Sequence, residues 1–148
     1  MVCTFFGHAD APKEIEPSLH AALIDLIENQ GVTEFYVGNN GKFDFMVYNQ
    51  LRELSKDYDI DYSVVLAYLK IKEEYPLNNT IFPEGIETVP KRFAISWRNK
   101  WMLKRADVVV TYVTHNYGGA AQFAHMAKQQ KKIIIALGEN GTQKNFMN

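Results

Sequence analysis

The chain has little of several features that define other protein classes. Cys3 is its only cysteine, so no disulfide framework can form within one chain. No apolar run approaches the roughly 18 residues of a membrane helix. Acidic residues appear early, and no apolar segment of a signal peptide follows Met1. We therefore expect a cytoplasmic protein with no membrane partner.

An excess of charge of one sign is also absent. Lysine and arginine number 16 against 17 aspartates and glutamates, for a formal net charge of -1. No overall basic field points to nucleic acid, so we do not expect that partner. No set of His, Cys, Asp and Glu has the spacing of a structural zinc site. We predict no metal site and assign no cofactor.

What the chain does have is the content of one domain. It has 148 residues, of which 47% are hydrophobic, and a domain of this size builds a core without metal or disulfide support. Apolar β-branched runs alternate with helical apolar stripes along the whole chain. We predict strands over residues 2–6, 34–37, 62–69, 106–113 and 133–137.

Helices are predicted between most of these strands. One opens at Pro17, a second near Phe43 or Asp44, and a third carries Phe93, Trp97 and Trp101 on one face. A fourth covers residues 119–130. Strands that alternate with helices indicate an α/β fold, here a Rossmann-like, doubly wound and mostly parallel five-stranded sheet with helices on both faces. We predict a single domain over residues 1–148.

The expected strand order is 3-2-1-4-5, which places the topological switch point between the first and fourth strands. The turns after those strands would then flank one crevice. Residues 73–90 are the least regular part, because Pro76, Pro83 and Pro90 exclude a long helix there. Connections of this length often serve as lids or binding segments.

The most informative segment runs from Arg98 through a buried strand into the turn Gly118-Gly119-Ala120. A glycine pair lets a ligand approach the backbone without a Cβ in the way. The following helix offers free N–H groups and the positive end of its dipole. We predict that Gly118, Gly119, Ala120 and the preceding Tyr117 bind a phosphate-bearing ligand. A tight strand-to-helix turn alone is the alternative.

Three further groups of residues are candidates for the same ligand. His8, after Gly7, could bind a phosphate or sugar or act as an acid or base near neutral pH. Asp44 could hold a ribose hydroxyl or simply cap a helix. Arg98 suits bidentate phosphate binding, or lies on a solvated helix face. The full candidate set adds their neighbours and comprises Gly7, His8, Gly38, Asn39, Gly41, Asp44, Arg98, Asn99, Tyr117, Gly118, Gly119 and Ala120.

These motifs resemble those of the SLOG superfamily. Residues 4–8 look like its "TGH" opening, and residues 35–44 resemble its second turn, with a phenylalanine, two glycines and an aspartate. Arg98-Asn99, Asp107 and Gly118-Gly119-Ala120 are similar to its "RN…SD…GGT" half. Together they cover about residues 2–138. The resemblance implies a Rossmann-like fold in a bacterial protein that binds nucleotides or nucleotide-derived ligands.

The superfamily includes cytokinin-activating phosphoribohydrolases, the DNA-processing protein A family and nucleotide sensors of bacterial defence. The hydrolases resemble "PGGxGTxxE", and this chain departs from that pattern. His125 stands at the position of the glutamate that assists hydrolysis, and the threonine is missing. The departure favours binding over hydrolysis, and we name no catalytic residue.

We therefore expect a nucleotide-binding sensor or regulatory protein. One alternative is an enzyme that cleaves an N-glycosidic bond, with His8, Asp44 or Glu84 as acid or base and Arg98 on the phosphate. A second alternative is a protein-interaction regulator. The aromatic stripe of Phe93, Trp97 and Trp101 motivates that reading and also an expected homo-oligomer, specifically a homodimer, built on a helix face.

Overall fold

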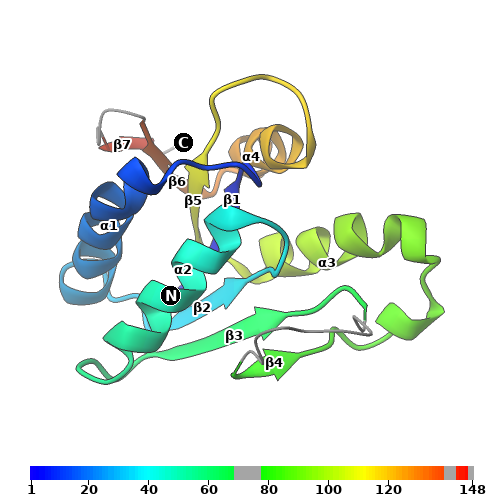
Figure 1. The fold of residues 1–148 in the computed structure, drawn as a ribbon, viewed down its shortest axis with the longest axis horizontal. Coiled ribbons are helices and arrows are strands. Elements are labelled where there is room, and N and C mark those ends of the chain that lie inside the picture. Colours follow the sequence, from blue (N-terminus) through cyan, green and yellow to red (C-terminus); the bar gives the residue numbers. More distant parts are fainter. Residues whose placement is uncertain (69–77, 139–142, 147–148) are drawn as a thin grey trace.

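The computed structural model of the protein describes residues 1–68, 78–138 and 143–146. Its elements follow one another as strands and helices in alternation for most of the chain (Figure 1). They are β1 (Val2–Gly7), η1 (Lys13–Ile15), α1 (Glu16–Glu28), β2 (Glu34–Val37), α2 (Lys42–Leu54), β3 (Asp61–Val65), β4 (Thr80–Ile81), η2 (Ile86–Thr88), α3 (Lys91–Arg105), β5 (Val108–Tyr112), α4 (Gly119–Gln129), β6 (Ile133–Leu137) and β7 (Gln143–Phe146).

The strands form one sheet in the order β4-β3-β2-β1-β5-β6-β7. Six strands are parallel, and β7 pairs antiparallel with β6. The predicted order of the five inner strands is confirmed, since β3-β2-β1-β5-β6 is the order 3-2-1-4-5. The predicted count of five is wrong, because two edge strands were missed. β4 has only two residues, and β7 is short and carries no apolar alternation.

Helices cover both faces of the sheet. One buried cluster joins α1 and α2 to alternate strand residues such as Phe5 and Val110. A second joins α3 and α4 to the residues between them, such as Phe6 and Val109. This alternation follows from the two-residue period of a strand, and it places β1 and β5 at the centre of the core. The molecule is an α/β protein with a largely parallel sheet.

The predicted element ends agree with the structure to within a few residues, with one larger difference. The third strand ends at Val65 rather than residue 69, and residue 69 lies outside the described residues. Residues 73–77 of the expected irregular connection also lie outside them. The remainder of that connection holds β4 and η2, so it is more regular than expected.

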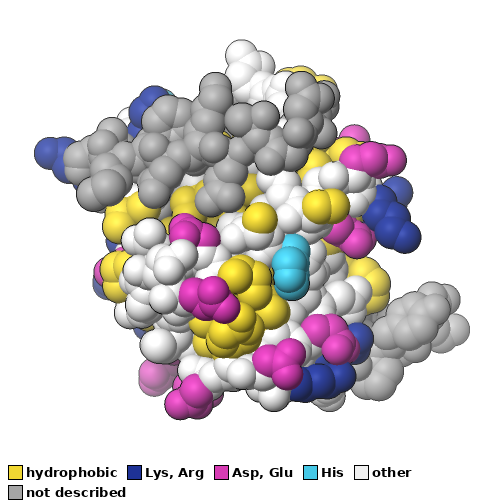
Figure 2. Space-filling model, turned by 90° about the vertical axis from the view of Figure 1, so that its left-hand side faces the viewer, with side chains coloured by type: hydrophobic (Ala, Val, Ile, Leu, Met, Phe, Trp, Pro, Cys, Tyr) yellow, Lys and Arg dark blue, Asp and Glu magenta, His cyan; other side chains and the backbone are white. Residues whose placement is uncertain are grey.

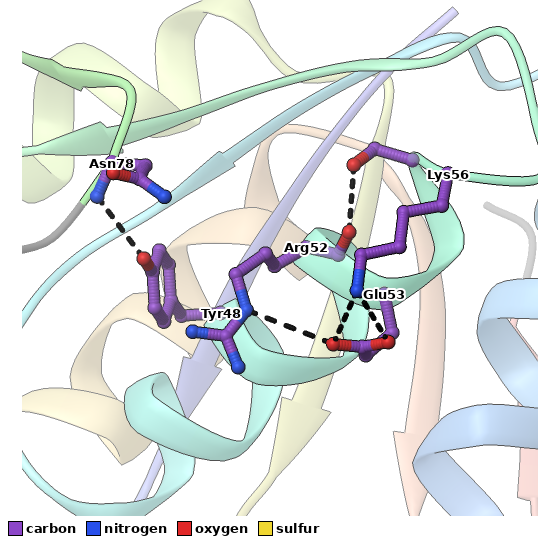
Figure 3. A network of polar contacts seen from close by, with 6 residues as sticks. Tyr48, Arg52, Glu53, Lys56 and Asn78 are labelled. Atoms are coloured by element: carbon purple, nitrogen blue, oxygen red, sulfur yellow. Dashed lines mark hydrogen bonds and ion pairs between the residues drawn. The ribbon is translucent and has the colours of Figure 1, made fainter.

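A small polar network fixes the outer side of α2 (Figure 3). The Tyr48 hydroxyl accepts a hydrogen bond from the backbone N–H of Asn78 at 3.0 Å, which ties α2 to the residues that enter β4. Just beyond the end of the helix, the Lys56 ammonium contacts both carboxylate oxygens of Glu53 at 3.0 and 3.1 Å. Exposed pairs of this kind contribute at most about 1 kcal/mol, so the Tyr48 contact is the structurally important part.

Figure 2 shows the side of the molecule that lies on the left in Figure 1. The helix α1 lies on this side. Acidic side chains are scattered over the described surface there, and basic ones lie nearer its margins. Within the described parts of the chain, no helix combines the length and the hydropathy needed to cross a bilayer.

Candidate functional site

A cleft of about 330 Å³ opens beyond the carboxyl ends of β1 and β5. Its volume is at the small end of the range of roughly 300–1,000 Å³ that small-molecule sites occupy. It lies at the predicted switch point, where the connections from β1 and β5 diverge. The lining residues are Phe5, Phe6, Gly7, His8, Ala9, Asp10, Asn40, Asp44, Ile95, Arg98, Asn99, Met102, His115, Gly118, Gly119 and Ala120.

The N-terminus of α4 forms one wall of this cleft. Gly118 is the N-cap and has φ +88°, a conformation that favours glycine. Gly119 has no such requirement, yet a Cβ added to either glycine would meet nothing within 4 Å. The first helical bond runs from Gln122 N–H to the Gly118 carbonyl at 3.0 Å. Open space therefore lies beside a helix start whose first N–H groups need partners.

Arg98 reaches the cleft from α3 but is buried, with 1% of its surface exposed. Its guanidinium donates to the side-chain oxygens of Asn39, Asn40 and Asn99 at 2.7–3.2 Å, and to the Val65 carbonyl at 2.8 Å. These bonds use four of its five N–H groups. Arg98 thus braces the turn after β2 and places a positive charge behind the cleft wall.

Asp44 lines the cleft from the first turn of α2. Its Oδ2 accepts the backbone N–H of Asn40 at 2.9 Å, in the turn before the helix. The N-cap of α2 is Gly41 and no side chain caps this helix, so the alternative of Asp44 as a helix cap is wrong. Burial raises the pKa of its carboxyl to about 6, and the Asn40 N–H and the Arg98 charge both oppose that rise. Asp44 therefore holds the turn before α2 and is also a cleft carboxyl whose pKa is raised toward neutral pH.

Close packing explains three of the candidate glycines. A Cβ on Gly38 would lie 2.9 Å from Asp44 Oδ2 and 3.0 Å from the Arg98 guanidinium carbon. A Cβ on Gly7 would lie 2.3 Å from the ring of Phe43. Gly41 has φ +98° and backs directly onto Ala9. These residues hold the turns together, so their glycine identity needs no ligand to account for it.

His8 is buried, with 6% of its surface exposed, and its ring holds the loop after β5. The backbone N–H of Thr114 donates to His8 Nε2 at 2.9 Å. That acceptor role requires the neutral ring, with its proton on Nδ1. Burial first, and then the nearby His115, lower the His8 pKa, while Asp10 opposes them. The lowered pKa and the acceptor role of Nε2 both favour a neutral imidazole at neutral pH.

The structure brings most of the predicted residues together. Eight line the cleft, namely Gly7, His8, Asp44, Arg98, Asn99, Gly118, Gly119 and Ala120. Gly38, Asn39 and Gly41 lie around a separate cavity of about 140 Å³ that shares Asp44. Tyr117 is exposed and is not part of the cleft lining.

The sequence reasoning omitted several lining residues. Asn40 lies in a turn that was already singled out, so its amide could have been included. Asp10 follows His8 by two residues and could have been included on the same ground. Ile95 and Met102 form an apolar patch on α3, one turn before and one turn after Arg98, and only helical spacing could have revealed them.

Two other residues that the sequence made candidates, Glu84 and His125, lie outside the cleft. Glu84 does not line the cleft. His125 lies with His115 beside a shallower depression on α4. Among the residues that the structure describes, no group of three or more His, Cys, Asp and Glu side chains could hold a metal ion.

No protein-family model matches the chain, and no curated protein matches it. The likeness to the SLOG superfamily therefore rests on the motifs alone, and the cleft is the basis for inferring function.

Proposed function

We propose that the protein binds a nucleotide or a nucleotide-derived small molecule in this cleft, as a sensor or regulatory protein with a Rossmann-like fold. The observation that carries the proposal is the N-terminus of α4. Two adjacent glycines there, Gly118 and Gly119, face open space inside a cleft at the switch point of the sheet. Such a helix start binds anions through its N–H groups and its dipole.

The ligand phosphate would lie at Gly119 and Ala120. Arg98 would stabilise it through its field, because most of its N–H groups are already engaged. Asp44 and Asp10 also line the cleft, and their carboxylates are suited to accept hydrogen bonds from sugar hydroxyls. A ligand with one anionic group and several hydroxyls fits this distribution of charge.

A thermal-shift screen tests the proposal. The panel is AMP, the other nucleoside monophosphates, ADP-ribose, NAD and cyclic ADP-ribose isomers. A ligand at 100 times its Kd adds about 2.7 kcal/mol to the unfolding free energy, which shifts Tm by several degrees. We expect at least one compound to do so. Absence of a shift with every compound would count against a nucleotide ligand.

A variant locates the bound phosphate. Gly119→Asp places a side chain and a negative charge in the open space, and should abolish the shift without unfolding α4, since acids suit a helix start. The matched control is Gln129→Glu, which adds the same charge at the far end of the same helix. Unchanged binding by a folded Gly119→Asp variant would reject the site.

A second candidate function is cleavage of a nucleotide N-glycosidic bond. The observation that favours it is Asp44, because a cleft carboxyl with a pKa of about 6 is suited to general acid or base work near neutral pH. Incubation with the same nucleotides should then release free base, and Asp44→Asn should stop the release. Lack of turnover with every nucleotide that binds would remove this candidate.

A further inference from the structure

Three aromatic rings form one stack, and two of them, His8 and His115, line the cleft. The His8 and His115 rings lie 3.7 Å apart, centroid to centroid, with 15° between their planes. The His115 and Tyr117 rings follow at 3.9 Å and 20°. These are the near-parallel arrangements of a stacked column. The column runs outward from the buried His8 to the exposed Tyr117.

The inner end of the column is fixed by contacts with the fold. His8 accepts the Thr114 N–H and forms a T-shaped pair with the Tyr112 ring, with 6.1 Å between centroids and 76° between planes. Nδ1 of His115 lies 3.1 Å from the Tyr117 carbonyl oxygen. The order of rings is therefore set before any ligand arrives. A preformed surface of this kind loses little entropy when a partner binds.

At the outer end of the column, the fold gives no comparable structural reason for the position of the Tyr117 ring. Tyr117 is 69% exposed, more than any other large hydrophobic side chain that the structure describes. One face of its ring rests on His115, and the other faces outward. Tyr117 also directly precedes Gly118, the N-cap of α4.

We propose that the outer face of the Tyr117 ring is the stacking subsite for the planar base of the ligand. This inference rests on the proposed function, because it assumes a phosphate at the α4 N-terminus. A base on Tyr117 would be the fourth ring of the column. Stacking on an aromatic face tolerates any base, so the subsite recognises a planar heteroaromatic group rather than a particular nucleobase.

The two deeper rings of the column, His8 and His115, offer no comparable face on which a base could stack. One face of His8 is covered by His115, and the ring also packs on Tyr112. Both faces of His115 are covered, by His8 and by Tyr117. The turn around Gly38 is filled by Asp44 and Arg98. Tyr117 is the member of the column whose ring keeps an uncovered face.

The test compares ligands with and without a base. AMP, GMP, CMP and UMP are titrated by calorimetry against ribose 5-phosphate, with wild type, Tyr117→Phe and Tyr117→Ala. We expect wild type and Tyr117→Phe to bind the monophosphates about ten- to hundred-fold more tightly than ribose 5-phosphate, as stacking predicts. In Tyr117→Ala that advantage should vanish while the affinity for ribose 5-phosphate stays unchanged. The exposure of Tyr117 makes a folded alanine variant the expected outcome.

A second readout is the proton spectrum of the bound base. Its aromatic protons should shift upfield in wild type and not in Tyr117→Ala. Equal affinities for monophosphates and ribose 5-phosphate in wild type would overturn the stacking subsite alone, as would a full base advantage in Tyr117→Ala. If neither kind of compound binds wild type, the proposed function fails for these ligands and the subsite falls with it.

Discussion

Gly41 and Gly119 lie at the starts of two helices that border the cleft, and a side chain would meet very different surroundings at each. A Cβ on Gly41 would lie 2.5 Å from the Ala9 Cα, and its φ of +98° is unfavourable for other residues. A Cβ on Gly119 would meet nothing within 4 Å. The fold therefore requires glycine at position 41, whereas at position 119 it does not.

Alanine substitutions should separate these two roles. We expect Gly41→Ala to lower the unfolding free energy by about 2–4 kcal/mol, from backbone strain and overpacking. Gly119→Ala should leave it unchanged or raise it by up to about 1 kcal/mol, because glycine is a poor helix residue. Urea denaturation of both variants measures the difference. Equal losses in the two would contradict the account of the α4 N-terminus.

The Asp44 carboxyl makes a definite prediction about pH. Its pKa rises from 3.8 in the unfolded chain to about 6 in the fold, so the folded state binds the proton more tightly. The stability it contributes is fully present below pH 3.8 and is lost as pH rises through 6. Relative to Asp44→Asn, wild type should lose on the order of 2 kcal/mol between pH 4.5 and 7.5. Denaturation curves at both pH values check this, and a pH-independent difference would refute it.

The loop from β5 to α4 depends on one contact with a neutral histidine. His8 Nε2 can accept the Thr114 N–H only while the ring is unprotonated. Burial lowers the His8 pKa below its ordinary value of 6.5, so the neutral form is favoured by the fold. This contribution to stability is present above pH 6.5 and is lost as pH falls through the folded pKa.

Hydrogen exchange at the Thr114 amide reports this contact directly. We expect its protection factor to fall about five- to ten-fold when pH drops from 7.5 to the acid side of the His8 pKa, since one hydrogen bond of about 1 kcal/mol is lost. His8→Gln retains an acceptor that does not titrate and should remove the pH dependence. Constant protection in wild type across this range would show that the loop is held in another way.

The α3 helix shows why an aromatic stripe predicts an interface poorly. Trp101 packs against the Tyr36 ring at 5.2 Å and lies under the Arg105 guanidinium at 3.8 Å. The residue of the stripe that stays open is Phe93, with 51% of its surface exposed. Helical spacing places the three aromatic residues on one side but cannot distinguish packing within the chain from packing between chains. A homo-oligomer therefore stays a prediction.

At the scale of the whole molecule, the net charge of -1 conceals a separation of charge. Residues 91–132 contain nine lysines and arginines and one acid, whereas residues 14–68 contain ten acids and three basic residues. Since α3 and α4 cover one face of the sheet and α1 and α2 the other, the basic segment belongs to one face. We expected no nucleic-acid partner because the net charge is close to zero. The net charge does not describe the charge of this one face.

Heparin chromatography measures that separation. Lys100→Glu with Lys104→Glu should lower the salt concentration at which the protein elutes, because both side chains are exposed on the basic face. The matched control is Arg52→Glu on α2 with Lys56→Glu just after that helix, which changes the net charge equally. Equal shifts in the two double variants would mean that net charge governs binding and that its distribution does not.

The sequence predicts the inner sheet well because strand and helix periodicity is strong from Val2 to Leu137. It cannot predict the edge strands β4 and β7. An edge strand can pair through its backbone without a pattern of apolar side chains that the sequence would reveal. It also identifies half of the residues that line the cleft, because the carboxyl ends of parallel strands meet at one edge of the sheet. The stacked column is beyond it, since rings as distant in sequence as His8 and His115 meet only through the register of β1 with β5.

The most direct test of the central claim is a map of ligand contacts by amide chemical shifts. Nitrogen-15 spectra of wild type are recorded during titration with the monophosphate or dinucleotide that gives the largest thermal shift. We predict the largest changes at Gly119 and Ala120, with smaller ones at Asn40 and Thr114 around the cleft. Saturable changes confined to another surface, such as the depression around Phe82 and Lys91, with Gly119 and Ala120 unmoved, would contradict the claim.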